Sequence, residues 1–222
     1  MITTAIKPNQ TPHPVRFTVQ DYHRLMALGF LGEDDHIELI RGAYSNGSKG
    51  TAHETCITRL LRVLLPIIGD RATLRCQSPI TLAFDGEPEP DFAIVQNRKD
   101  DYESAHPTSA ETLLVIEVAD SSLEYDRTVK LSLYAEASIP HYWLFNVIDR
   151  YLEAYGEPAE VVPGQFGYLT RRIVPGQEAV ALPPFPRRNW HFHQFLTVQC
   201  SPCPCFPHLH WIRRGYDRSW LT

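Results

Sequence analysis

Apolar residues recur along the chain at two spacings, which predict helices and strands respectively. The clearest helical spacing covers residues 53–68, where apolar side chains fall at intervals of three and four residues. A shorter pattern of the same kind covers 19–28, with Thr18 as its N-cap and Gly29 at its end. Alternating or continuous apolar residues predict strands at 37–40, 71–84 (interrupted at Ser78-Pro79), 92–95, 113–118, 142–147 and 151–155.

The stretch from Pro88 to Trp143 has the order strand, loop, strand, helix, strand, and it carries the most informative polar residues. Asp91 stands at the start of its first apolar run, and Glu117 stands inside the second. An unbroken apolar run marks a strand buried on both faces, where a carboxylate is costly unless it is paired or bound to a metal. The alternative for Glu117 is an exposed strand end, bonded to a neighbouring helix N-terminus. The companion residues favour the buried site.

A lysine on the helix expected after this strand offers a third group. Asp126, Lys130 and Tyr134 fall on one stripe of that helix, at i, i+4 and i+8. The pattern leaves two interpretations open: a surface ion pair between Asp126 and Lys130, or a Lys130 that reaches over the sheet towards Glu117. Two carboxylates on neighbouring strands, with an ammonium nearby, can hold Mg²⁺ and act on a phosphodiester.

The composition is that of an ordinary globular protein, with 43% hydrophobic and 21% charged residues among 222. No apolar run is long enough to span a bilayer, and residues 1–20 lack the apolar segment of a secretion signal. Five cysteines, an odd number, indicate free thiols in a reducing compartment, so we expect a cytoplasmic protein with no membrane partner. The net charge of −5 does not itself indicate nucleic-acid binding. A DNA enzyme with this charge needs a local basic face or bound metal ions.

Charge and composition divide the chain into three parts. Residues 1–15 contain three prolines and no periodic pattern, which predicts a flexible N-terminal arm. Residues 16–186 form the expected domain, and residues 187–222 form an atypical basic tail that contains Cys, His and Trp. The five arginines and one acid of the tail give it a charge of +4, which leaves −9 for the rest of a chain whose total is −5. Prolines at 183, 184 and 186 mark the boundary.

The tail also contains Cys200, Cys203 and Cys205, followed by His208 and His210. These residues supply enough ligands for one tetrahedral zinc site. The intervening prolines stiffen the segment, and a second well-spaced ligand pair is not evident. The sequence therefore favours a C-terminus without a selected function, such as the product of an altered reading frame, over a zinc-binding interaction segment.

In its motifs the chain resembles the Uma-two family of restriction endonuclease proteins, within the PD-(D/E)xK nuclease superfamily. The likeness covers about residues 16–155. Each piece is weak alone, and the shared order and spacing make the signal. The pieces are, in order, Arg16-Phe-Thr-Val, Glu33 to Gly42, His53, Gln77-Ser-Pro-Ile, Glu89-Pro-Asp, Val115 to Arg127, Lys130-Leu, Leu133-Tyr-Ala, Ile139-Pro and Tyr142-Trp-Leu.

The resemblance implies an α/β (α+β) fold of the restriction-endonuclease-like type, in which helices flank a mixed central sheet. It also implies a catalytic site in which Asp91 and Glu117 bind Mg²⁺, with Mn²⁺ as a substitute. The backbone carbonyl of Val118 would be a further metal ligand. Carboxylate and carbonyl oxygens are the ligands that Mg²⁺ prefers.

The remaining site residues follow from the same resemblance. The superfamily has a lysine two residues after the glutamate, and Ala119 replaces it here. Lys130 matches a lysine that the family takes from the following helix, and we expect it to orient water or neutralise charge in the reaction. Glu38 is similar to an acid that the family places near the same cleft, which makes it a fourth catalytic candidate. His53 and Gln77 match family positions for which we assign no role.

The implied function is that of a metal-dependent DNA endonuclease, which hydrolyses phosphodiester bonds. The alternative is a catalytically silent module on the same fold that binds nucleic acid or a protein. The intact set of Asp91, Glu117 and Lys130 favours the enzyme, although a fold alone does not establish activity. DNA is the expected partner. Members of the superfamily often dimerise to cut both strands, so a homodimer is a further expectation.

Overall fold

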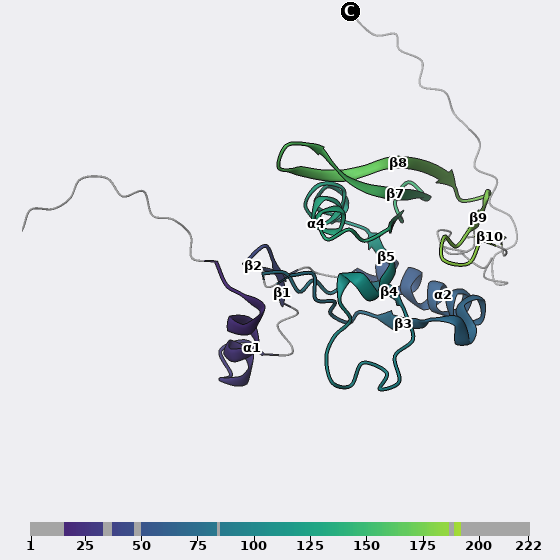
Figure 1. The fold of residues 1–222 in the computed structure, drawn as a ribbon. Coiled ribbons are helices and arrows are strands. Elements are labelled where there is room, and N and C mark those ends of the chain that lie inside the picture. The colour runs from purple at the N-terminus through teal and green to yellow at the C-terminus, as the bar shows by residue number, and fades with distance from the viewer. Residues whose placement is uncertain (1–15, 33–36, 47–49, 84, 187–188, 192–222) are drawn as a thin grey trace, which may run out of the picture.

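The computed structural model describes residues 16–32, 37–46, 50–83, 85–186 and 189–191 (Figure 1). The predicted N-terminal arm at 1–15 lies outside the described residues. Of the predicted tail at 187–222, only residues 189–191 are described, so the candidate zinc ligands between Cys200 and His210 also lie outside the described residues.

Six strands build the central sheet. They are β3 (Thr73–Cys76), β4 (Phe92–Val95), β5 (Thr112–Ala119), β6 (His141–Asn146), β7 (Tyr151–Val162) and β8 (Gln165–Pro175), and they lie side by side in that order. β5 and β6 are parallel, whereas the other neighbouring pairs are antiparallel. The predicted α/β fold with a mixed central sheet is therefore confirmed.

Helices cover both faces of this sheet because its central strands are apolar on both faces. All four residues of β4 are buried, and β5 is buried along nearly its whole length. One face packs against α2 (Thr51–Ile68) through Leu60, Leu64 and Ile68. The other face packs against α4 (Leu131–Glu136), and Figure 1 shows α2 and α4 on opposite sides of β5.

The N-terminal elements lie beside this sheet. Helix α1 (Val19–Ala27) begins at the predicted N-cap Thr18, whose side chain and that of Asp21 form a reciprocal capping box. Strands β1 (Ile37–Ile40) and β2 (Ala43–Asn46) form a hairpin, and β1 is joined to the loop before β4 by hydrogen bonds between the backbones of Leu39 and Glu87. A second short pair, β9 (Ala179–Ala181) and β10 (Asn189–His191), closes the described chain.

The segment after β5 is helical, as predicted, but it is not one regular α-helix. It consists of a single turn, α3 (Leu123–Tyr125), a π-helical turn, η4 (Asp126–Lys130), and then α4. Two of the charged residues of the wider π turn, Asp126 and Lys130, are buried. π turns inside helices are rare and frequently occur at functional sites.

Two of the predicted strands differ in extent from those observed. The strand expected at 71–84 ends at Cys76, because Gln77 adopts a left-handed φ of 46° and Pro79 has no amide hydrogen to donate. Residues beyond Pro79 make only isolated bridges, at Thr81 and Ala83. By contrast, β7 extends to Val162, and its partner β8 was not predicted.

The described chain also contains two short 3₁₀ turns, η2 (Gly69–Arg71) after α2 and η3 (Ser109–Glu111) before β5. Among the described residues, no helix has the length and apolar character that a membrane span requires.

Candidate active site

Asp91 and Glu117 are brought together by the register of β4 and β5. Phe92 pairs with Ile116 in antiparallel register, so Asp91, one residue earlier, lies opposite Glu117. The amide of Asp91 lies 3.4 Å from Oε2 of Glu117, and both side chains are buried. The two predicted carboxylates, Asp91 and Glu117, are therefore neighbours beside the N-terminal end of β4.

The carboxylate of Asp91 accepts two hydrogen bonds at one oxygen. The backbone N–H of Val118 donates to Oδ2 at 2.9 Å, and Nε2 of His53 lies 2.9 Å from the same oxygen. Burial by itself would raise the pKa of Asp91, but the hydrogen bond and charge of His53, the Val118 N–H and the charge of Lys130 outweigh it and lower that pKa. Asp91 is therefore an anion in the interior, held in place from α2 and β5.

The pKa of Glu117 is raised, whereas that of Asp91 is lowered. Its side chain is only 5% exposed, which contradicts the alternative of an exposed strand end. Lys130 donates to Oε1 at 3.0 Å and Tyr134 donates to the same oxygen at 2.6 Å. Burial nevertheless raises the pKa of Glu117 to about 8, because the attraction of Lys130 is opposed by the charges of neighbouring acids such as Asp91.

Lys130 adopts the second of the two predicted arrangements. Its ammonium reaches over the sheet to Glu117 and also donates to Oε1 of Glu38 at 3.2 Å. Burial would lower the pKa of Lys130, but the negative charges of Glu117, Glu38 and Asp126 outweigh it and raise that pKa. The π turn thus delivers a charged ammonium to the carboxylates.

Sequence reasoning did not assign Asp126 and His53 to the site. Asp126 is 3% exposed, accepts a hydrogen bond from the Ser122 hydroxyl at 2.6 Å, and has a pKa raised by burial. The shared stripe with Lys130 was the available signal for Asp126. For His53, at the start of α2, no sequence signal beyond its family position indicated the contact with Asp91. We call Glu38, Asp91, Glu117, Asp126 and Lys130 the acidic cluster.

The oxygens of the acidic cluster fit the chemistry of Mg²⁺ or Mn²⁺. Oε2 of Glu38 is buried without a hydrogen-bond partner among the described residues. In the described part of the chain no three Asp, Glu, His or Cys side chains form a compact ligand set. A metal would therefore rely on Asp91 and Glu117 with a backbone carbonyl such as that of Val118, and on water for its remaining positions.

The chain is similar to known proteins in sequence and in fold. A family model described as "Putative restriction endonuclease" (Uma2) matches residues 19–199. The chain belongs to this family. The match extends beyond the motifs at 16–155 and includes β7, β8 and the short strands that follow.

A solved structure shares the fold of this Uma2 protein. It is the crystal structure of a "putative nuclease belonging to DUF820" from Anabaena variabilis, which is 13% identical in sequence and superposes with a TM-score of 0.59. The similarity covers 82% of this chain and 98% of that one. No curated protein matches the sequence.

Ala119 stands two residues after Glu117 in this Uma2 chain, and the lysine that contacts the glutamate comes from another element. Ala119 is fully buried beside the helical segment, within the second hydrophobic cluster. Lys130 enters from η4, above the same face of β5, and contacts Glu117 directly. The ammonium that contacts Glu117 thus comes from the helical segment after β5.

Proposed function

We propose that this Uma2 protein is a metal-dependent DNA endonuclease that hydrolyses phosphodiester bonds. The observation that carries the proposal is the 3.0 Å contact between the buried ammonium of Lys130 and Glu117, with Asp91 beside them. A buried carboxylate pair with one ammonium is costly for stability, and perturbed groups of this kind concentrate at catalytic sites.

The proposed division of labour follows from the charge of each group. Asp91 and Glu117, with the Val118 carbonyl, would hold Mg²⁺ or Mn²⁺. The bound ion would supply Lewis acidity at the phosphate and lower the pKa of a water. Lys130 would orient the attacking water and offset charge that develops on the phosphate oxygens. Glu38 would keep the ammonium aimed at Glu117, through its own 3.2 Å contact.

His53 would position Asp91. The hydrogen bond from His53 would keep Asp91 ionised and oriented, as partners of metal ligands commonly do. Water would add across one P–O bond and leave a phosphate monoester and a hydroxyl group.

DNA, a homodimer and a cytoplasmic location belong to the same proposal. The family supports a nucleic-acid substrate, and a chain of net charge −5 would need the metal and a local basic surface to approach a phosphate backbone. Within the described part of the chain, Cys56 is a free thiol, which is compatible with a reducing compartment. The homodimer rests on the superfamily resemblance.

Cleavage of supercoiled plasmid tests the proposal. We expect the wild-type protein to nick plasmid with Mg²⁺ or Mn²⁺ and to lose this activity with EDTA. Glu117→Gln and Lys130→Met should each reduce the rate by at least about 100-fold, because each removes a group at the reacting phosphate. Glu124→Gln is the matched control, since Glu124 is an exposed acid on α3 outside the acidic cluster.

The outcomes separate the two candidate functions. Cleavage that EDTA, Glu117→Gln and Lys130→Met abolish, and that Glu124→Gln retains, supports the nuclease and its site together. A folded wild-type protein that binds DNA without cutting it would instead support the catalytically silent binding module. Cleavage that survives in Glu117→Gln would show that the activity comes from elsewhere in the sample.

A further inference from the structure

The edge of the sheet next to the acidic cluster carries a second set of polar groups. β3 is the edge strand, and its register with β4 places Cys76 opposite Phe92. The ladder continues for one more residue, because the amide of Gln77 donates to the carbonyl of Asp91 at 3.0 Å. Gln77 therefore lies directly beside a proposed metal ligand.

Gln77 has two features that its packing does not explain. Its φ of 46° lies in the left-handed region, which a glutamine rarely adopts and which persists mainly where the surroundings enforce it. Its side-chain nitrogen is buried and has no hydrogen-bond partner among the described residues. Buried amide donors are nearly always satisfied, so an unsatisfied one next to an active site indicates a missing acceptor.

Arg75, two residues earlier on β3, provides a charge on the site's face of the sheet. It pairs with Ala93, a residue of the hydrophobic cluster that also contains Tyr134 and lies on the same face as Glu117. Two residues along a strand correspond to about 7 Å. Arg75 is therefore within a short distance of Gln77 and Asp91, at the same edge of the sheet.

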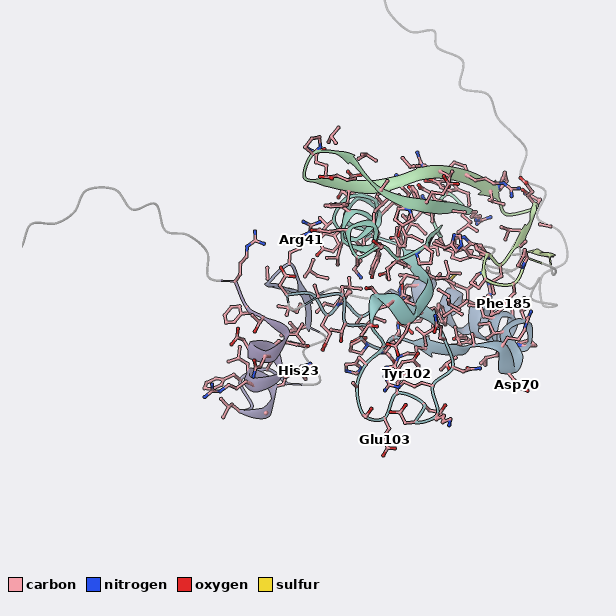
Figure 2. All side chains as sticks on the ribbon, viewed as in Figure 1. His23, Arg41, Asp70, Tyr102, Glu103 and Phe185 are labelled. Atoms are coloured by element: carbon pink, nitrogen blue, oxygen red, sulfur yellow. The ribbon has the colours of Figure 1, made fainter. Side chains whose placement is uncertain are left out.

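The guanidinium of Arg75 lacks an acidic partner in the described part of the chain. Its Nε is buried without a hydrogen bond, and its Nη2 lies 3.4 Å from Nδ1 of His106. The guanidinium carbon lies 5.7 Å from the centre of the Tyr102 ring. Figure 2 shows Tyr102 on the loop below β3, on the side of that loop towards the sheet, whereas Glu103 points away from it.

Arg98, in the loop that contains Tyr102, is a nearby arginine with a structural role and is useful for comparison. Arg98 also lies over the Tyr102 ring, at 4.1 Å, but Asp100 binds its guanidinium at 2.6 Å. Its charge is neutralised within the protein. Arg75 has a similar aromatic support without a carboxylate, and it is only partly buried. An arginine that is oriented and yet unpaired is suited to bind an external anion.

We propose that Arg75 and Gln77 form a phosphate-binding site on the edge strand, which seats the DNA backbone next to the acidic cluster. This inference rests on the proposed nuclease function. Arg75 contacts one phosphate through the terminal nitrogens of its guanidinium. The Gln77 side chain, whose amide nitrogen is covered in the unbound protein, turns outward to donate to an oxygen of the phosphate nearest Asp91. Both residues position the substrate. They hold the strand so that the scissile phosphate lies over Asp91 and Glu117.

Binding of duplex DNA by a non-cleaving protein tests the inference. The reference is the Glu117→Gln protein with Mg²⁺, and affinity is measured by fluorescence anisotropy at several salt concentrations. Adding Arg75→Met, which keeps an apolar stem beside Tyr102, should weaken binding about tenfold. It should also reduce the slope of log affinity against log salt by about 0.9, the value for one lost phosphate contact.

Three companion variants make the result specific. Arg75→Lys restores a positive charge and should restore the salt slope, which a merely structural arginine would not do. Gln77→Ala should weaken binding about threefold with no change of slope, because the amide is uncharged. Arg62→Ala removes an exposed arginine from α2, on the opposite side of the sheet, and should leave both quantities unchanged.

Failure of this inference is distinguishable from failure of the proposed function. If the Glu117→Gln protein binds DNA and folded Arg75→Met binds it with the same affinity and slope, the phosphate site is wrong and the nuclease proposal stands. If neither the wild type nor the Glu117→Gln protein binds DNA at any salt concentration, both proposals are wrong. Thermal melts confirm that each variant is folded.

Discussion

At the scale of single residues, the acidic cluster has more negative charge than its surroundings can stabilise. Glu38, Asp91, Glu117 and Asp126 interact with one ammonium, Lys130. Asp91 keeps its charge through two hydrogen bonds, whereas burial raises the pKa of Glu117 to about 8. Proteins retain such arrangements where function requires them, at a cost in stability.

Glu117→Gln should therefore separate stability from activity. Burial raises the pKa of the metal-free Glu117 carboxyl to about 8, so we expect a neutral amide of nearly equal shape to replace it at little cost. We expect the free energy of unfolding in EDTA to change by less than about 1 kcal/mol. Urea denaturation of the wild type and the variant measures this difference, beside the plasmid assay.

Lys130→Met should have a larger effect on the free energy of unfolding than Glu117→Gln. It removes the ammonium that faces Glu117 and Glu38 and leaves buried carboxyl groups without a cation. Removing one partner of a buried pair costs about 3–5 kcal/mol, so this variant should be clearly less stable. Equal destabilisation by Glu117→Gln and Lys130→Met would show that the Glu117 carboxylate is ionised and structurally required.

At the scale of elements, the sequence predicted those whose apolar pattern is strong. β4, β5 and α2 are buried on the faces that their patterns indicate, and their predicted bounds are within two residues of those observed. The stripe of Asp126, Lys130 and Tyr134 also predicted which side chains share a face. The sequence could not decide between a surface ion pair and a buried lysine, because the spacing of residues along a helix does not show whether that face contacts solvent or the sheet.

The ribbon of β7 and β8 was missed beyond Tyr155 because its outer half lacks an alternating apolar pattern. Residues such as Glu160, Arg171 and Arg172 are exposed and alternate poorly with apolar ones. The ribbon is joined to the body of the protein by the pairing of β7 with β6 and by the ion pairs of one buried acid, Glu153. The partners of Glu153 come from distant positions in the sequence and left no local signal.

Glu153 predicts an acid-dependent loss of stability. Arg127 of the π turn donates to it at 2.7 Å and Arg171 of β8 at 2.8 Å, and the Tyr155 hydroxyl also donates to it. Burial would raise the pKa of Glu153, but these three partners outweigh it and lower that pKa below the usual 4.5. Its contribution to stability is therefore complete above about pH 4.5 and is lost as the pH falls through the folded-state pKa.

Glu153→Gln should remove that contribution at neutral pH. Hydrogen bonds between charged groups contribute about 1.5–3 kcal/mol, and we expect the free energy of unfolding at pH 7 to fall by this amount. The loss should shrink as the pH drops below 4.5, because the wild-type side chain becomes protonated there. Urea denaturation between pH 3 and 7 measures both effects, with exposed Glu157→Gln on the same strand as control. Parallel pH profiles for wild type and Glu153→Gln would contradict the assignment.

At the scale of the whole molecule, the candidate site is assembled from segments that are far apart in the sequence. Glu38 comes from β1, His53 from α2, Asp91 and Glu117 from neighbouring strands, and Lys130 from the π turn. The sequence pattern had indicated Asp91, Glu117 and Lys130 as site candidates, and the family resemblance added Glu38. The contact of His53 with Asp91 depends on how α2 packs across the end of the sheet, which no local pattern encodes.

A divalent cation should therefore stabilise the whole fold through this one site. An ion that binds the native state at 100 times its Kd adds about 2.7 kcal/mol to the free energy of unfolding. For a domain of this size that corresponds to a rise in Tm of roughly 5–10 °C. We expect Mn²⁺ to raise the Tm of the wild type by this amount, EDTA to reverse it, and sodium chloride of equal ionic strength to reproduce little of it.

Asp91→Asn distinguishes this site from any other metal-binding segment of the chain. It removes the ionised carboxylate while keeping the shape of the side chain beside Val118 and His53, so Mn²⁺ should no longer raise the Tm. An undiminished Mn²⁺ effect in Asp91→Asn would place the ion elsewhere. The cysteines and histidines between Cys200 and His210 would then be the first alternative.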